Sequence, residues 1–268
     1  MQGNVVRYRA LITGGSRGIG RAIVEAIVPF CERIFVVGRD PVALEQLRLQ
    51  LVETEIVTLT GDVTDPRFVS EIQDSVSIKG GLNLLINNAG ITDFTNYRDQ
   101  SFHDVHRMIE VNLVAPMRLT QSLLPDLTKE PEAQIINIGS SFGYIGYPGY
   151  AAYCATKFGL RGFTESLCRE LDGSPVRVRL FSPRTTQTEA NSPSARDLNQ
   201  TVGNHADSAE KVASEFLKFL KGTDLQKQLG FPESLFAWLN QAAPSLVAGG
   251  IRKQLPQIRK ILASKRVA

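Results

Sequence analysis

Strand-like and helix-like stretches alternate along most of the 268-residue chain, and this alternation limits the fold more than any other feature of the sequence. Short apolar runs, typical of buried strands, are separated by segments long enough to form helices. The six runs span residues 9–13, 33–37, 55–60, 82–86, 134–138 and 176–181. Connections of this length favour parallel pairing of neighbouring strands with right-handed crossovers. The pattern predicts an α/β fold with a doubly wound parallel sheet in three layers.

The composition is that of an ordinary globular protein, with 43% hydrophobic and 21% charged residues. The three cysteines and three histidines show neither C-x-x-C pairing nor metal-ligand spacing, so we expect no disulfide framework, no metal site and a cytoplasmic location. We find no signal-peptide core and no apolar run of about eighteen residues, which predicts neither secretion nor a membrane span.

A glycine-rich turn directly follows the first apolar run. Gly14, Gly18 and Gly20 allow a tight turn and close approach of a ligand, and the helix that starts here offers N–H groups to a pyrophosphate. The same loop contains Ser16, Arg17 and Ile19. A tight turn from strand to helix can use glycine without binding a ligand, so the motif indicates a dinucleotide site only because of its place in the alternating pattern.

The end of the second run indicates which dinucleotide is bound. Folds that prefer NAD usually carry an acidic residue here, which accepts hydrogen bonds from the ribose hydroxyls. Gly38 takes that place in this chain and Arg39 follows, with Arg17 as a second cation on the glycine-rich loop. Two guanidinium groups suit a 2′-phosphate, so we prefer NADP(H) over the alternative of two unrelated surface charges.

Two further strand ends carry groups that could line the same crevice. Asp62 and Val63 follow the third run, where Asp62 could meet the adenine amino group, whereas Asp65 is better interpreted as the cap of the next helix. The fourth run leads into a small-residue segment that allows close approach of a ribose. This segment contains Asn88, Ala89 and Gly90.

The stretch from Ser140 to Lys157 carries groups suited to proton transfer. Tyr153 and Lys157 are four residues apart and share one face of a helix, where the ammonium would lower the pKa of the phenol. Intervening glycines let Ser140 fold back, so that its hydroxyl and the phenol could meet at one carbonyl oxygen. A buried tyrosine beside a solvated lysine is the alternative.

Asn112 lies among apolar residues in a long helical stretch, residues 102–124. A buried amide needs partners, so Asn112 is either a satisfied core group or a group that holds a water and a bent backbone near the site. His103 and His106 lie one turn earlier without a third metal ligand, and we expect both on the helix surface.

These motifs, in this order and approximate spacing, resemble those of the short-chain dehydrogenase/reductase family over residues 7–188. The resemblance implies a Rossmann-type sheet, a nicotinamide cofactor and hydride transfer at a carbonyl or alcohol carbon. Carried over to this chain, it makes Tyr153 the acid and base, with Lys157 lowering its pKa and holding the nicotinamide ribose. Ser140 would orient the substrate oxygen, and Asn112 would hold a proton-relay water.

Two segments depart from the family pattern. The usual Pro-Gly after the sixth strand is Pro183-Arg184 here, and Thr188 takes the place of a threonine that helps to hold the nicotinamide amide. Pro183, Thr186 and Thr188 are therefore further candidate cofactor contacts, in a segment (182–204) that we expect to be an irregular flap. At the C-terminus, a segment beginning FPESLFAWLNQ stands where many members have a short strand and a Val-Asp-Gly-Gly-like sequence.

We expect residues 1–204 to form the dinucleotide-binding and catalytic domain, and residues 205–268 to form a helical extension. Pro232 predicts a helix start, and Pro244 and Pro256 predict short helical pieces afterwards. Residues 235–246 would cover the substrate crevice, contact another subunit or lie on a membrane surface. Residues 244–268 contain six basic and no acidic residues, which fits an anionic surface or a solvated helix face.

The predicted function is NADPH-dependent reduction of a ketone or aldehyde to an alcohol, on a lipophilic or acyl-like substrate. The alternatives are an NADP-dependent alcohol or hydroxysteroid-type dehydrogenase running in the oxidative direction and a non-catalytic NADP(H)-sensing protein. A sensor has no need of all four of Asn112, Ser140, Tyr153 and Lys157. We expect a small-molecule carbonyl or alcohol substrate, a homo-oligomer and no nucleic-acid partner.

Overall fold

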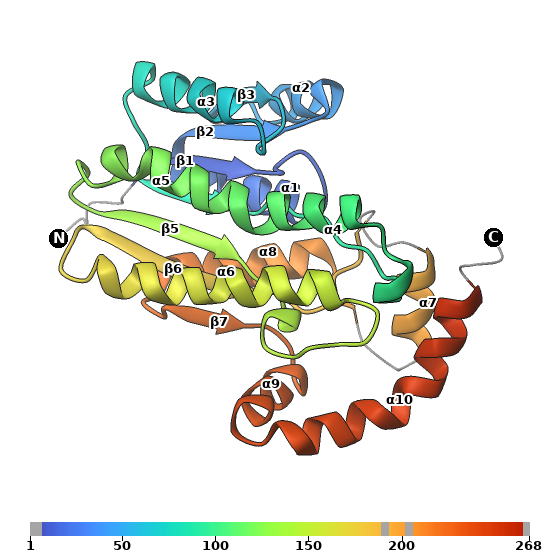
Figure 1. Cartoon of the computed structure of the whole chain (residues 1–268). Helices are drawn as coiled ribbons and strands as arrows, with labels where there is room; N and C mark the ends of the chain where they lie inside the picture. The colour runs from blue at the N-terminus through green and yellow to red at the C-terminus, as the bar shows by residue number, and fades with distance from the viewer. Residues whose placement is uncertain (1–6, 189–192, 202–205, 265–268) are drawn as a thin grey trace.

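The computed structural model describes residues 7–188, 193–201 and 206–264 (Figure 1). Its centre is one seven-stranded sheet in the order β3-β2-β1-β4-β5-β6-β7, in which every pair of neighbours is parallel. The strands are β1 (Tyr8–Thr13), β2 (Cys31–Gly38), β3 (Glu55–Thr60), β4 (Leu84–Asn87), β5 (Ala133–Ile138), β6 (Val176–Ser182) and β7 (Gln226–Gln228). The order runs outward from β1 in one direction and from β4 in the other, which confirms the predicted doubly wound sheet.

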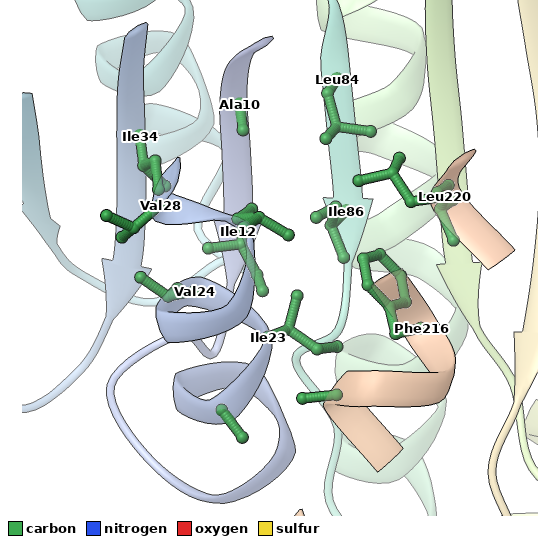
Figure 2. Close-up of a cluster of buried hydrophobic side chains, with 14 of the residues drawn as sticks. Ala10, Ile12, Ile23, Val24, Val28, Ile34, Leu84, Ile86, Phe216 and Leu220 are labelled. Atoms are coloured by element: carbon green, nitrogen blue, oxygen red, sulfur yellow. The ribbon is translucent and has the colours of Figure 1, made fainter. Parts of the chain in front are cut away.

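Helices cover both faces of the sheet and complete three layers. On one face lie α1 (Gly18–Ile27), α2 (Pro41–Gln50) and α8 (Ala209–Lys221). On the other lie α3 (Pro66–Ile78), α5 (Ala115–Leu127) and α6 (Ala151–Glu170). Strand residues alternate between the two cores, so Ile12 faces α1 whereas Leu11 faces α5. Figure 2 shows Ile12 and Ile86 of the sheet meeting Ile23 of α1 and Phe216 of α8.

The Rossmann-type unit extends further along the chain than we predicted. α8 places Val212, Phe216 and Phe219 in the main core, and β7 pairs with β6 at the edge of the sheet. The predicted boundary at residue 204 therefore lies inside this unit. β7 is a short final strand, which the C-terminal sequence did not suggest. β7 has only three residues, Gln226–Gln228, and its polar sequence carries no strand pattern.

The segment predicted to be irregular contains a helix, α7 (Pro193–Thr201). Proline suits the first turn of a helix, and Ala195 and Leu198, three residues apart, share one buried face. They pack in a cluster with Ile258 and Leu262 from the C-terminal helix. The helix forms because a distant segment covers its apolar face, which the polar composition of residues 182–204 did not indicate.

The C-terminal segment forms α9 (Glu233–Ala242) and one long helix, α10 (Pro244–Ser264). Pro256 was predicted to divide this region, yet α10 runs through it. Proline removes one backbone N–H, a loss that tertiary packing can offset. Ile258 and Leu262, just beyond the proline, are buried against aromatic side chains, and this packing holds the last turns in place.

The long helical stretch before β5 has three parts: α4 (Phe102–Ile109), a π-helical turn (Glu110–Val114) and α5. Short 3₁₀ turns occupy Val28–Phe30, Tyr97–Asp99 and Ser141–Gly143. As predicted, Asp65 caps α3 by accepting a hydrogen bond from the N–H of Arg67 at 2.9 Å. No helix in the described ranges is long and apolar enough to cross a membrane.

Candidate active site

A cavity of about 750 Å³ lies at the carboxyl ends of the central strands. Parallel sheets gather polar loops at this edge, which is where ligands of doubly wound folds bind. Of the described residues predicted for the site, all but Asn112 line this cavity. They are Gly14, Ser16, Arg17, Gly18, Ile19, Gly20, Arg39, Asp62, Val63, Asn88, Ala89, Gly90, Ser140, Tyr153, Lys157, Pro183, Thr186 and Thr188.

The glycine-rich loop has a shape that side chains would prevent. Gly14 and Gly18 adopt φ values of 65° and 54°, which favour glycine. A Cβ on Gly20 would lie 2.1 Å from the backbone oxygen of Gly14. Arg17, at the N-cap position, gives α1 no capping side-chain hydrogen bond, whereas Asp40 caps α2. The first N–H groups of α1 are thus arranged to receive an anionic group such as a pyrophosphate.

Asn88 holds this loop against the end of β4. Its Nδ2 donates hydrogen bonds to the backbone oxygens of Thr13 at 2.9 Å and Gly14 at 3.1 Å. In return, the hydroxyl of Thr13 accepts hydrogen bonds from the N–H groups of Asn88 and Ala89, both at 3.0 Å. This role of Thr13 was not predicted, although the residue directly precedes the glycine-rich loop.

The two arginines expected to read a 2′-phosphate differ in their surroundings. Arg17 forms an ion pair with Asp40, whose other carboxylate oxygen caps α2. The capping N–H of Ala43 and the guanidinium of Arg17 lower the pKa of Asp40, which opposes the effect of burial. Arg39 is exposed at the cavity and has no carboxylate partner in the part of the chain that the structure describes. Arg39 is therefore the cation better placed for an anionic ligand.

Asp62 is engaged by a partner that the sequence did not reveal. Its Oδ2 pairs with Arg107 of α4, and its Oδ1 accepts hydrogen bonds from the N–H of Thr64 at 2.9 Å and its hydroxyl at 2.7 Å. Burial opposes ionisation, but Thr64 and Arg107 together lower the pKa of Asp62. The carboxylate thus stays charged and fixed at the cavity wall, and its contact with an adenine amino group stays a prediction.

Asn112 lies in the π-helical turn and is buried. Its Oδ1 accepts from the N–H of Ile91 and its Nδ2 donates to the oxygen of Ile91, both at 2.8 Å. A further bond runs from Nδ2 to the hydroxyl of Thr156 at 3.2 Å. Asn112 therefore joins the chain after β4 to α6, which carries Tyr153. Its amide is satisfied by protein partners in a π-helical turn, and its role in holding a water stays a prediction.

Ser140, Tyr153 and Lys157 meet at the end of β5. Ser140 follows this strand, and Tyr153 and Lys157 lie on the first turns of α6. The side chains of Ser140 and Tyr153 both line the cavity, and the hydroxyl of Ser140 favours the ionised form of the Tyr153 phenol, which lowers its pKa. The Nζ of Lys157 donates a 2.9 Å hydrogen bond to the oxygen of Ile138 and lies 5.8 Å from the centre of the Tyr153 ring.

Burial sets the protonation of Tyr153 and Lys157 in this structure, and the lowering of the phenol pKa by Lys157 stays a prediction. Burial raises the pKa of Tyr153 to about 12, and the nearby Ser140 hydroxyl opposes this effect only in part. Burial also lowers the pKa of Lys157 to about 8. Both charged forms lose hydration in the cavity wall, and the ammonium is directed at a backbone oxygen. Tyr153 therefore carries its proton at neutral pH in this structure.

Aromatic residues form one wall of the site beside Tyr153. This wall was not predicted from the sequence. Tyr150 stacks on Phe94 with ring centres 5.0 Å apart and lies 4.9 Å from Phe142, and the ring of Phe142 meets that of Tyr153 edge-on at 6.3 Å. The C-terminal helix covers this wall with Ile258 and Leu262. We call Phe94, Phe142 and Tyr150 the aromatic wall.

The C-terminal residues expected to cover the cavity are elsewhere. Leu235, Phe236, Trp238 and Leu246 are exposed, and the described cavity lining includes no residue of α9. The prediction that residues 235–246 close the crevice is therefore wrong for this structure. The end of α10, rather than α9, reaches the aromatic wall, because α9 packs through Ala237 near Tyr144, on the far side of the 3₁₀ turn 141–143.

Arg184, which replaces the glycine usual in the family, is a structural clip. Its Nε and Nη2 each lie 2.8 Å from the carboxylate of Asp207, and its Nη1 lies 3.4 Å from Glu233. A Cβ on Gly230 would lie 2.5 Å from the Cδ of Arg184, so a glycine makes room for the arginine. The clip joins the cavity segment 183–188 to the starts of α8 and α9.

We predict that Asp207→Asn destabilises the protein in a pH-dependent way. The hydrogen bond from Arg184 is the main reason that the pKa of Asp207 falls to about 2. Because the folded value lies below the unfolded one, the stabilisation is present above about pH 4 and is lost as the pH falls towards 2. The variant should lose about 1–2 kcal/mol of unfolding free energy at pH 7 in urea titrations. A loss that stays constant from pH 7 down to pH 3 would contradict this explanation.

Comparison with known proteins agrees with this geometry. The family model described as short chain dehydrogenase matches residues 8–199. The 3-oxoacyl-(acyl-carrier-protein) reductase FabG of Salmonella typhimurium is 32% identical over 214 residues, which cover 76% of this chain and 86% of that protein. A short-chain dehydrogenase from Sphingobium yanoikuyae in complex with NADPH has a TM-score of 0.76 at 24% identity, over 89% of this chain and 94% of that one. A short-chain dehydrogenase/reductase from Burkholderia phymatum in complex with NAD has a TM-score of 0.81 at 20% identity, over 90% and 95%.

A parallel sheet with a glycine-rich loop at its carboxyl edge, next to a Ser–Tyr–Lys group, is the arrangement of a nicotinamide-dependent oxidoreductase. The chain belongs to the short-chain dehydrogenase family and acts on CH–OH and C=O groups. No group of three or more His, Cys, Asp or Glu residues that could hold a metal ion occurs in the ranges that the structure covers.

Proposed function

We propose that this protein reduces a ketone or aldehyde to an alcohol with NADPH, on a lipophilic or acyl-like substrate. The observation that carries the proposal is that Ser140, Tyr153 and Lys157 line one cavity, next to the rings of Phe142 and Tyr150. Reduction of a carbonyl consumes one proton, and a phenol that holds its proton at neutral pH can donate it. The same residues would serve an alcohol dehydrogenase in the opposite direction.

The residues at the cavity fit a nicotinamide dinucleotide. The uncapped start of α1 and the left-handed Gly14 and Gly18 suit the pyrophosphate, and Arg39 suits a 2′-phosphate. Lys157 would hold the nicotinamide ribose, and Thr186 and Thr188 would contact the nicotinamide end. When bound, this cofactor supplies the hydride. This fit depends on the shape of the glycine-rich loop, which a Cβ at Gly20 would not allow.

The chain itself would supply orientation and a proton. Ser140 and Tyr153 donate hydrogen bonds to the substrate oxygen, and Tyr153 transfers its proton as charge develops there. The Lys157 ammonium, buried behind the phenol, would stabilise the phenolate that remains. Asn112 keeps the chain after β4 fixed to α6 and so keeps Tyr153 in place. These roles follow the family pattern at the matching positions.

The substrate class rests on the aromatic wall and on the relatives. Phe142 and Tyr150 line the cavity beside the proton donor, and the buried Phe94 stacks on Tyr150. The FabG relative is named for reduction of 3-oxoacyl groups. The test is NADPH consumption by the purified protein with carbonyl compounds graded in chain length and polarity. Turnover that rises with apolar length supports the proposal, whereas oxidation of alcohols without reduction of any carbonyl at neutral pH would favour the dehydrogenase alternative.

We predict that Arg39→Asp weakens NADPH binding more than NADH binding. The change replaces a phosphate partner with a carboxylate that repels phosphate and accepts hydrogen bonds from ribose hydroxyls. The ratio of the two dissociation constants should move towards NADH by about tenfold or more, equivalent to about 1.4 kcal/mol. Fluorescence titration of both cofactors measures this ratio. Arg48→Asp, at a surface arginine of α2 paired with Glu45, is the control that should leave the ratio unchanged.

A homo-oligomer and a cytoplasmic location complete the proposed function. Ile109, Met117 and Phe158 are partly exposed apolar residues on the helices of one face, which supports a contact between copies of the chain. All three cysteines are free thiols, which supports a reducing compartment. Light scattering of the purified protein would give the number of subunits.

A further inference from the structure

The C-terminal hairpin exposes a group of large apolar side chains. Phe231 and Trp238 are 77% and 64% exposed, and Leu235, Phe236 and Leu246 are exposed as well. Ala237 is buried and lies on the opposite side of α9 from the stripe formed by Leu235 and Trp238. α9 therefore rests on the body of the protein through a small residue and turns its larger apolar residues to solvent.

The position of this group in the fold leaves it accessible. Figure 1 shows α9 and the first half of α10 projecting away from the sheet, beyond the edge strand β7. The later part of α10 returns to the body, where Gln254 accepts a hydrogen bond from Tyr147 and Ile258 and Leu262 pack against the aromatic wall. The exposed apolar side chains thus lie on an arm rather than in the catalytic cavity.

The exposed side of α10 carries basic residues without acidic partners. Arg252, Lys253, Arg259 and Lys260 are exposed, opposite the buried Val247, Ile258 and Leu262. None of the four forms an ion pair with another described residue, whereas Arg48, Lys218 and Arg161 elsewhere are paired with glutamates. The sequence contains no acidic residue after Glu233, which is itself bound by Arg184. The arm is therefore apolar and cationic at once.

We propose that α9 and α10 form a docking surface for an anionic lipid membrane, on which the protein lies without crossing it. Aromatic and leucine side chains insert at the level of the headgroups, and nearby lysines and arginines bind anionic lipids. A second copy of the chain fits this surface less well, because a symmetric contact would bring the unpaired cations of the two copies together. The proposal does not depend on the reaction that the cavity catalyses.

Trp238 is the single tryptophan of the chain, so intrinsic fluorescence reports on this surface directly. We expect the full-length protein to sediment with vesicles of phosphatidylglycerol and phosphatidylcholine, with a blue shift of the tryptophan emission. Pure phosphatidylcholine vesicles should bind at least about tenfold more weakly, and added salt should weaken binding to the anionic vesicles.

Variants at the arm and at matched distant sites test the assignment. Arg252→Glu should weaken vesicle binding at least about fivefold, and Trp238→Ser should weaken it by a similar factor. The controls are Arg67→Glu, at an exposed arginine of α3 that has no described ion pair, and Ile78→Ser, at an exposed isoleucine that ends α3. Both controls should bind vesicles as the unchanged protein does.

Three results would overturn the proposal. The first is no sedimentation with anionic vesicles at low salt, and the second is equal binding to neutral and anionic vesicles. The third is self-association without lipid that shifts the emission of Trp238 and disappears in Trp238→Ser, which would show that a second copy covers the arm.

Discussion

Replacing Tyr153 with phenylalanine should reduce turnover by about two to four powers of ten, because loss of a positioned proton donor typically has this effect. The substitution removes the phenol oxygen and keeps the ring, which contacts Phe142 and Tyr150 in the aromatic wall. We therefore expect the variant to fold and to bind NADPH with a dissociation constant within a few-fold of the original. Steady-state NADPH consumption and a cofactor titration measure the two quantities separately.

Tyr147→Phe is the matched control. This neighbouring tyrosine loses the same atom, but its hydroxyl donates to Gln254 at 2.9 Å and it is not among the residues that line the cavity. Its variant should keep near-normal turnover. If Tyr153→Phe turned over as fast as Tyr147→Phe, proton transfer would have to come from another group, and the assigned role of Tyr153 would be wrong.

Replacing Gly20 with alanine should abolish tight cofactor binding and lower stability, although alanine is normally the better helix former. The added Cβ would lie 2.1 Å from the oxygen of Gly14 and 2.5 Å from the Nδ2 of Asn88. Neither atom can move away easily. The oxygen of Gly14 belongs to the backbone of the loop, and the Nδ2 of Asn88 is hydrogen-bonded to that loop from the end of β4. Forcing extra atoms into a packed site typically costs about 1–3 kcal/mol of unfolding free energy.

Gly162 in α6 offers the opposite case, since a Cβ there meets nothing within 4 Å. Gly162→Ala should raise the unfolding free energy by up to about 1 kcal/mol and leave NADPH binding unchanged. Urea denaturation and fluorescence titration of both variants provide the comparison. Unchanged NADPH affinity in Gly20→Ala would show that the loop does not hold the dinucleotide.

The fold could be predicted from the sequence because its main signals are local. Each long strand is an apolar run of adjacent residues, and the predicted run at 55–60 coincides with β3. Asp65 caps α3 through a neighbour two residues away, which the spacing alone indicated. The edge strand β7 lacks such a signal and forms only because β6 offers it a partner.

In the candidate site, too, some features could be predicted from the sequence and others could not. Ser140, Tyr153 and Lys157 could be chosen from their spacing along the chain, because a strand end and one helix face bring them together. The direction of the pKa shifts of Tyr153 and Lys157 could not be predicted, because burial is the main cause of both. Desolvation is set by everything packed around a group, and spacing along the chain does not record it.

The sequence by itself determined the parallel sheet, the glycine-rich loop and the identity of the groups at its edge. Only the tertiary structure decided that Arg184 clips to Asp207 and Glu233, and that α10 continues through Pro256 to cover the aromatic wall. Strand and helix patterns reflect neighbours a few residues apart. An ion pair over 23 residues and a helix end packed on a distant ring depend on how the whole chain folds back, so no local pattern could contain them.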